Sequence, residues 1–322
     1  MSGTDQPEGQ TRVGFLGPPG TFTEEALLGQ ADLAAGELVP LRSMPHVLAA
    51  TSVGEVDIGF VALENSIEGT VRQVLDALIF EHDLLIQREV VINVRQSLLA
   101  PAGTALADVK RVASFPDAAA QCQRFLSEHL PGVAVVAATS TAEAAREVGE
   151  KPFDGTAAIG TSLAAKLYDL DVLAEAIEDN ADNRTRFVVV APPSAGIPEI
   201  TGHDKTTIVC FQKHDQPGSL HAILGQFTAR NINLTKLESR PTKHTLGDYC
   251  FIIDLEGHVD DEVVYDTLRD LHAQLRHIKF LGSYPAAGEH GPARRRDAAK
   301  SWRAADRWVG DLRSRVVRPS GR

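Results

Sequence analysis

The segment at 183–187, Asn-Arg-Thr-Arg-Phe, places one hydroxyl beside two guanidinium groups. Such a set can hold an anionic substrate and donate a hydrogen bond to a departing oxygen. The segment runs directly into the apolar stretch at 187–190, which reads as a strand, so a rigid element would carry Thr185. An Arg-Thr-Arg step where a strand begins is by itself more typical of a solvated strand edge. Its chemistry therefore depends on the elements around it.

The region 13–191 alternates short apolar runs with helical stretches, a pattern typical of an α/β fold with a largely parallel sheet. Five joints in it carry hydroxyl or amide side chains where a helix should begin, at 17–24, 64–71, 114–117, 139–143 and 161–163. Helix N-termini favour anions, and in an open α/β sheet these ends meet at one crevice. Each joint alone fits an ordinary N-cap. Five of them, with the Arg-Thr-Arg step, predict a cleft for a small polyanion.

A second domain is predicted after the Pro-rich stretch at 192–198, whose composition indicates a linker. Its expected elements are a strand, a helix, two strands, a helix and a strand, at 206–211, 217–229, 232–238, 248–255, 260–275 and 278–281. This βαββαβ order is ferredoxin-like. We therefore expect a first domain at 11–191, a linker at 192–204, a second domain at 205–284 and a tail at 285–322.

Several kinds of chemistry find no support in the sequence. No Gly-x-Gly-x-x-Gly follows a predicted strand, and the histidines form neither His-Glu-x-x-His nor a cluster with cysteine, so no dinucleotide and no metal is expected. Cys122, Cys210 and Cys250 form no Cys-x-x-Cys pair, which favours a reduced, cytoplasmic protein. No stretch resembles a signal peptide or a membrane span. What remains is cofactor-free chemistry on an anion.

Charge is unevenly distributed along the chain. The formal net charge of −11 argues against a general nucleic-acid binder, yet residues 285–322 carry ten Lys or Arg and only four Asp or Glu. Apolar residues that include Trp302, Trp308 and Leu312 recur there at helical spacing. An amphipathic helix at about 298–316 and a disordered basic extension are the two alternatives. The helix would pack on the acidic body or a neighbouring subunit rather than on a membrane.

Short motifs follow one another in a fixed order along the chain. They are Gly-Pro-Pro-Gly-Thr-Phe-Thr at 17–23, Glu-Asn-Ser at 64–66, Ser-Thr-Ala at 140–142, Thr-Arg-Phe at 185–187, Gly-Ser-Leu-His at 218–221 and Glu-Ser-Arg-Pro at 238–241. Together they resemble the motifs of bacterial prephenate dehydratases with a C-terminal regulatory ACT domain, over nearly everything between 13 and 285. Ser-Phe-Pro-Asp at 114–117 departs from the usual Ser-His-Pro-Gln, although Ser114 and Gln121 match.

The resemblance implies a two-lobed catalytic domain similar to periplasmic binding proteins, with the chain crossing between lobes near 90–94 and returning near 180–185. It implies a lyase that converts prephenate to phenylpyruvate without a cofactor and that L-phenylalanine inhibits in a dimer or tetramer. Thr185 would donate a hydrogen bond to the leaving hydroxide, aided by the positive charge of Arg186. The residues expected to bind the substrate are Thr21, Glu64, Asn65, Ser66, Ser114, Gln121, Thr141, Ser162 and Phe187. Those expected to bind the effector are Gly218, Ser219, Leu220, Asn231, Glu238, Ser239, Arg240 and Pro241.

Alternatives remain open for two residues and for the function. Glu64 could act as an acid, but pairing with Arg184 or Arg186 is favoured because a carboxylate would repel a dianion. Phe187 could pack in the core or contact the substrate ring. Arogenate is an alternative substrate, and a non-catalytic amino-acid sensor is an alternative function. A sensor has no need of a leaving-group donor such as Thr185.

Overall fold

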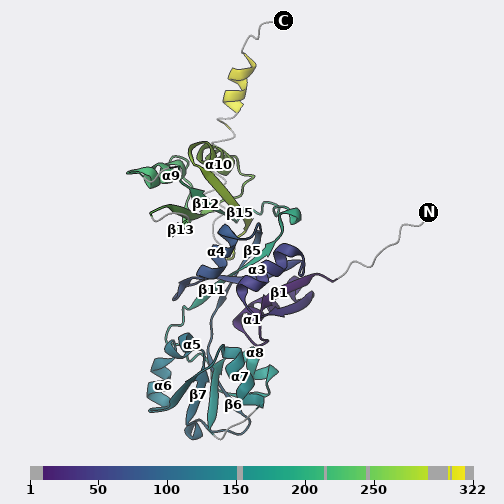
Figure 1. The fold of residues 1–322 in the computed structure, drawn as a ribbon, viewed down its shortest axis with the longest axis vertical. Coiled ribbons are helices and arrows are strands. Elements are labelled where there is room, and N and C mark those ends of the chain that lie inside the picture. Colours follow the sequence, from purple (N-terminus) through teal and green to yellow (C-terminus); the bar gives the residue numbers. More distant parts are fainter. Residues whose placement is uncertain are drawn as a thin grey trace, which may run out of the picture. The chain divides into compact units, whose positions relative to one another are not determined.

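The structure is a computed structural model that describes residues 10–150, 155–213, 216–243, 247–288, 304 and 307–315. Its contacts divide the chain into two compact units. The first extends to Leu84 and continues from Glu89 to Ala195, and the second comprises Leu85–Arg88 and the chain from Gly196 onward. Figure 1 shows the elements of each unit. Within the described residues, no helix has the length and apolar character to span a membrane.

The first unit begins with a lobe built on a sheet of strand order β2-β1-β3-β11-β5, with β4 paired to β3. Its strands are β1 (Arg12–Leu16), β2 (Glu37–Leu41), β3 (Ile58–Asn65), β4 (Gly69–Thr70), β5 (Leu85–Asn93) and β11 (Arg184–Ala191). Its helices are α1 (Phe22–Leu28), α2 (Ala31–Ala34), α3 (Met44–Val53) and α4 (Arg72–Phe80). Strand β1 is parallel to β2 and β3, whereas β11 is antiparallel to β3.

A second lobe of the same unit has the strand order β10-β6-β9-β7-β8. Its strands are β6 (Ser97–Pro101), β7 (Arg111–Ser114), β8 (Ala134–Ala137), β9 (Thr156–Gly160) and β10 (Leu170–Ala174). Its helices are α5 (Pro116–Ala120), α6 (Gln123–His129), α7 (Thr141–Glu150) and α8 (Ser162–Leu167), with a 3-10 helix at Leu106–Asp108; another 3-10 helix, Pro193–Ala195, follows β11. Strand β7 is parallel to β8 and β9, and β6 is antiparallel to β9 and β10.

The chain passes between the two lobes twice, after β5 and again before β11. The crossings are joined where the Val94 N–H donates to the Asn183 carbonyl at 2.8 Å. Two sheets linked by two crossings confirm the two-lobed fold expected from the sequence. The sheets are mixed rather than largely parallel, because β11 is antiparallel to β3 in the first and β6 is antiparallel to its two neighbours in the second.

The second unit has the order β12 (Asp204–Phe211), α9 (Ser219–Thr228), β13 (Leu234–Pro241), β14 (Tyr249–Glu256), α10 (Glu262–Gln274) and β15 (His277–Pro285). Its sheet has the order β13-β14-β12-β15, and its paired strands are antiparallel. Residues of both helices and of the sheet, including Ile208, Phe227 and Leu271, form one buried cluster. This confirms the predicted ferredoxin-like βαββαβ module.

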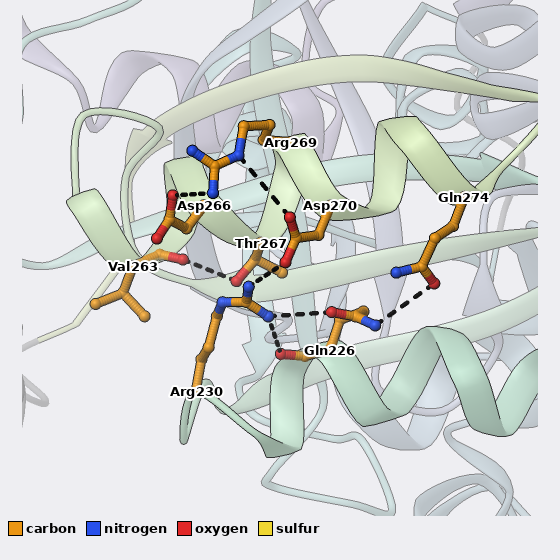
Figure 2. Close-up of polar contacts among 8 residues, drawn as sticks. All are labelled: Gln226, Arg230, Val263, Asp266, Thr267, Arg269, Asp270 and Gln274. Atoms are coloured by element: carbon orange, nitrogen blue, oxygen red, sulfur yellow. Dashed lines mark hydrogen bonds and ion pairs between the residues drawn. The ribbon is translucent and has the colours of Figure 1, made fainter. Parts of the chain in front are cut away.

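Helices α9 and α10 are also joined by polar contacts, which Figure 2 shows. Arg230, just after α9, forms a short ion pair with Asp270 of α10. Its Nη1 also donates to the Gln226 carbonyl at 3.3 Å and to the Gln226 Oε1 at 3.1 Å. Gln226 Nε2 in turn donates to Gln274 Oε1 at 3.4 Å. The Arg230 guanidinium therefore hydrogen-bonds a carbonyl in the last turn of α9 and links α9 to α10.

One local prediction was wrong. The polar run at 64–71 is not a helix start: β3 continues to Asn65, the chain returns as β4, and α4 begins only at Arg72. At α1, by contrast, the Thr21 hydroxyl accepts from the Glu24 N–H, so the joint at 17–24 is an N-cap.

The predicted tail helix falls partly outside the described residues, and Trp302 is among those not described. Residues 307–314 are helical, with Trp308 and Leu312 exposed. The partner expected for the apolar stripe of this helix stays a prediction.

Candidate active site between the two lobes

The two lobes meet where the loop before α1 rests on α8. The hydroxyl of Thr161, the N-cap of α8, donates to the Gly20 carbonyl at 2.9 Å, and the Tyr168 hydroxyl donates to the Pro19 carbonyl at 2.7 Å. Gly20 has a φ of +94°, and a Cβ added there would lie 3.2 Å from the Cβ of Ala164. Only glycine fits such a left-handed close approach without strain. The opening glycine-rich motif is therefore an interface between lobes.

A closed ring of hydrogen bonds joins the lobes on the side of the crossings. Asn65 Nδ2 donates to Asn183 Oδ1 at 2.8 Å, and Asn183 Nδ2 donates to Gln121 Oε1 at 2.9 Å. Gln121 Nε2 donates to the Glu68 carboxylate at 3.0 Å, and the Glu68 N–H donates to Asn65 Oδ1 at 3.0 Å, which closes the ring. Asn65 and Glu68 belong to the β3–β4 hairpin of the first lobe, whereas Gln121 follows α5 in the second.

The Thr185 hydroxyl lies beside this ring. Strand register places Thr185 opposite Asn65, and Asn65 Nδ2 donates to Thr185 Oγ1 at 3.0 Å. The side chain is nearly buried, with 9% of the residue exposed. Since a hydroxyl has one proton and two lone pairs, a received hydrogen bond leaves the Thr185 proton available to another acceptor. The geometry thus makes Thr185 a donor.

Arg186 points away from Thr185, because neighbouring residues of a strand face opposite sides. Register places it opposite Glu64, and its Nη1 lies 3.6 Å from Glu64 Oε2. Its Nε lies 2.7 Å from Glu89 Oε2, whose side chain is 1% exposed. The expected pairing of Glu64 with Arg186 is present. Two carboxylates offset the guanidinium charge there, which argues against the expected assistance to Thr185.

Several predicted substrate-binding residues have other uses in this structure. The Thr21 hydroxyl donates to the Leu16 carbonyl and caps α1. Ser66 bonds to the backbone of Asp182 and Arg184. The buried Ser114 hydroxyl donates to the carbonyl of Phe115.

Phe187 is 1% exposed, stacks on Phe60 with ring centroids 5.2 Å apart and lies in the core cluster of the first lobe. Of its two predicted roles, core packing is therefore the one observed. Thr141 and Ser162 open α7 and α8 of the second lobe, and Ser162 is exposed.

Sequence reasoning missed three residues, Asn183, Glu68 and Glu89. Asn183 is 1% exposed and lies in the segment that drew attention for its hydroxyl and guanidinium groups. Its position two residues before Thr185 in the sequence could have marked it as a site residue. Glu68 lies in a segment predicted to start a helix, and Glu89 is one acidic residue in strand β5. No sequence pattern marks either glutamate as part of the site.

Other chemistry is unsupported in the described part of the chain. Among those residues, no group of three or more His, Cys, Asp or Glu side chains could hold a metal ion. Burial, with smaller contributions from Asp179 and Glu178, raises the pKa of the Cys122 thiol to about 12. A thiol with such a pKa stays protonated at neutral pH and is a poor nucleophile.

The second unit has an open cavity of about 430 Å³ at the start of α9. It is lined by Gln212, Gln216, Gly218, Ser219, Leu220, His221, Leu224 and Phe251. The structure thus brings together three of the predicted effector residues, Gly218, Ser219 and Leu220. The other five, Asn231, Glu238, Ser239, Arg240 and Pro241, do not line this cavity.

Comparisons with known proteins match both units. Residues 13–195 match the prephenate dehydratase family and residues 206–273 match the ACT domain. A prephenate dehydratase of Mycolicibacterium gilvum is 41% identical over 291 residues, which cover 87% of this chain and 93% of that protein. One of Mycobacterium tuberculosis strain H37Rv is 40% identical over 321 residues, covering 96% of this chain and 97% of that protein.

Two solved structures are similar to most of the chain. The prephenate dehydratase of Arthrobacter aurescens in complex with L-Phe has a TM-score of 0.85 and 39% identity, covering 94% of this chain and all of that one (100%). GqqA, described as a quorum quenching acylase, has a TM-score of 0.78 and 30% identity, covering 86% of this chain and 98% of that one. With its ordered motifs, two-lobed first unit and βαββαβ second unit, the chain belongs to the prephenate dehydratase family and carries a C-terminal ACT domain.

Proposed function

We propose that this chain is a prephenate dehydratase, a lyase that releases carbon dioxide and water from prephenate to give phenylpyruvate. The observation that carries the proposal is the Thr185 hydroxyl, which receives a hydrogen bond from Asn65 Nδ2 at 3.0 Å beside the junction of the lobes. Family membership supports the choice of substrate. The proposed activity needs no cofactor.

The reaction requires one well-placed donor. Prephenate has a ring carboxylate, a pyruvyl carboxylate and a ring hydroxyl. The electron pair of the bond to the ring carboxylate moves into the ring as carbon dioxide departs, and the bond to the hydroxyl breaks as the ring becomes aromatic. Charge then develops on the departing oxygen, where Thr185 donates its hydrogen bond. A single preorganised donor of this kind contributes about 100- to 1,000-fold in rate.

The remaining groups of the site hold and orient. Gln121 Nε2, which gives one of its two hydrogens to Glu68, and the hydroxyls of Thr141 and Ser162 offer hydrogen bonds from the second lobe to the substrate's oxygens. Asn65 uses both of its amide hydrogens within the site and holds Thr185. For Arg186 we propose a positioning role in place of the catalytic one predicted from the sequence. Its ion pairs with Glu89 and Glu64 hold the start of β11, and so the backbone of Thr185, in place.

Regulation is proposed for the second unit. The cavity at the start of α9 would take L-phenylalanine, with the amino acid's polar groups near Ser219 and Gln216 and its ring near Leu224 and Phe251. The L-Phe complex of the Arthrobacter aurescens relative supports this effector. The predicted effector residues of β13 would act from another copy of the chain, in a dimer or tetramer. We also propose a cytoplasmic location, which the free thiols of three buried cysteines suit.

The direct test is turnover of the purified full chain. Prephenate and then arogenate are supplied separately, and phenylpyruvate and phenylalanine are quantified by chromatography. Phenylpyruvate from prephenate, with little phenylalanine from arogenate, supports the proposal. Preference for arogenate would make the chain an arogenate dehydratase, and turnover of neither would favour a non-catalytic sensor.

A further inference from the structure

The ring of hydrogen bonds beside Thr185 contains two residues to which the proposed chemistry assigns no task, Asn183 and Glu68, and of these Asn183 bonds directly to Asn65 Nδ2, the group that donates to Thr185. We propose that Asn183 is a positioning residue that makes the orientation of the Thr185 hydroxyl depend on contact between the lobes. This inference rests on the proposed dehydratase activity. The side chain of Asn183 is linked to the Thr185 hydroxyl by hydrogen bonds through Asn65, and to the second lobe through Gln121.

The direction of every hydrogen bond in the ring is fixed. Asn65 Oδ1 accepts from the N–H groups of Ile67 and Glu68 at 2.9 and 3.0 Å. The other end of the Asn65 amide must therefore be the donor, and it donates to Asn183 and Thr185. Since a carboxylate only accepts, Glu68 must receive from Gln121 Nε2. The Asn183 amide must therefore present its oxygen to Asn65 and its NH₂ group to Gln121.

Asn183 is also immobilised at the point where the chain crosses between lobes. Its carbonyl accepts from Val94 N at 2.8 Å, its own N–H donates to the Asn180 carbonyl at 3.2 Å, and the residue is 1% exposed. Gln121 is held from the same crossing, because its carbonyl accepts from Asp179 N at 2.6 Å. A side chain placed here responds to the relative position of the lobes.

Opening of the lobes would break the ring at its link between Gln121 and Glu68. Gln121 would then lose the acceptor that orients its amide, and it could rotate and turn its NH₂ group toward that of Asn183. The Asn183 amide would rotate in response and turn its own NH₂ group toward that of Asn65. Asn65 would shift to avoid this clash and would release Thr185 Oγ1. The leaving-group donor is thereby in place only when the lobes enclose a substrate.

The first experiment is a double-mutant cycle in the full chain, with prephenate as substrate. Asn183→Ala should lower kcat about tenfold or more, as expected for loss of a buried hydrogen bond of about 1.4 kcal/mol. In the Thr185→Ala background the same change should lower kcat by less than about twofold, since its effect passes through that hydroxyl. Equal losses in both backgrounds would overturn the proposal.

The second experiment reverses the direction of the hydrogen bonds from position 183 through Gln121 to position 68. It does not depend on whether Asn183→Ala folds. Asn183→Asp makes position 183 an acceptor toward both neighbours, so Gln121 must rotate and present Oε1 to the Glu68 carboxylate. Adding Glu68→Gln supplies a donor there and restores every bond. We expect the single change Asn183→Asp to lower kcat about 30-fold and the double change to recover at least about fivefold of it.

Asp182→Asn is the matched control, because it removes the same charge from the exposed neighbouring residue. Combined with Asn183→Asp, it should give no recovery. Equal recovery with Asp182→Asn and with Glu68→Gln would show that only the net charge matters, and it would refute the ring. An absence of recovery with Glu68→Gln would also refute the ring. Turnover of prephenate by the wild type is measured first, so failure of the activity itself is distinguished from failure of this inference.

Discussion

Arg186→Met is expected to destabilise the first unit strongly. The guanidinium lies 2.7 Å from Glu89, whose side chain is 1% exposed, and Arg186 itself is only 11% exposed. Its removal leaves the Glu89 carboxylate in a dry site without this cation. Breaking one side of a buried ion pair costs about 3–5 kcal/mol. Adding Glu89→Leu should restore most of the loss, because apolar replacement of a whole buried pair is often neutral.

The assay is urea unfolding of the four members of this cycle, followed by far-UV circular dichroism. Tryptophan fluorescence is unsuitable because both tryptophans, Trp302 and Trp308, lie in the tail. Arg146→Met is the control, since Arg146 pairs with Glu143 and Glu150 on the surface of α7 and should contribute far less. A loss for Arg186→Met below about 1 kcal/mol, or equal to that of the control, would refute the buried pair as a support of β11.

Three further results are expected. Gly20→Val should raise KM for prephenate several-fold in initial-rate assays, because φ of +94° and the contact with Ala164 force the lobes apart; an unchanged KM would count against this interface. Gly218→Val, at a φ of +86° beside the cavity, should raise the L-phenylalanine concentration for half-inhibition at least about tenfold, and unaltered inhibition would exclude the cavity. Burial raises the pKa of the Cys122 thiol from 9.0 to about 12. The thiol therefore ionises at a lower pH in the unfolded chain than in the folded one, so its contribution to stability is complete below pH 9 and is lost as the pH rises toward 12. The urea midpoint of wild type should thus fall more between pH 8 and 10 than that of Cys122→Ala, and parallel curves would contradict it.

Much of the fold could be predicted because local patterns and long-range packing agree. The apolar runs at 206–211 and 248–255 lie within two residues of the bounds of β12 and β14, and the proline-rich stretch at 192–198 contains the boundary between the two units at Gly196. The hairpin at 64–71 was mistaken for a helix start because polar residues after a strand suit both. Its outcome is decided by pairing with β11, a contact across about 120 residues that no local pattern reveals.

The candidate site was predicted in part, for a similar reason. Thr185 and Asn65 were identifiable by residue type and motif, and the structure joins them by a hydrogen bond. Glu89 was not identifiable, because one carboxylate in an apolar strand becomes meaningful only when Arg186 is placed beside it. Ser66 and Thr21 have hydroxyls that suit substrate binding, yet backbone groups nearby use them. Residue type indicates what a side chain can do, and packing decides which partner it has.

We propose the Thr185 hydroxyl as the donor to the leaving group of prephenate. The decisive measurement is kcat and KM for Thr185→Ala and Thr185→Ser, followed as phenylpyruvate formation from prephenate. We expect Thr185→Ala to lower kcat about 100- to 1,000-fold with KM little changed, and Thr185→Ser, which keeps a hydroxyl, to retain more activity. A kcat for Thr185→Ala within about threefold of wild type would contradict it.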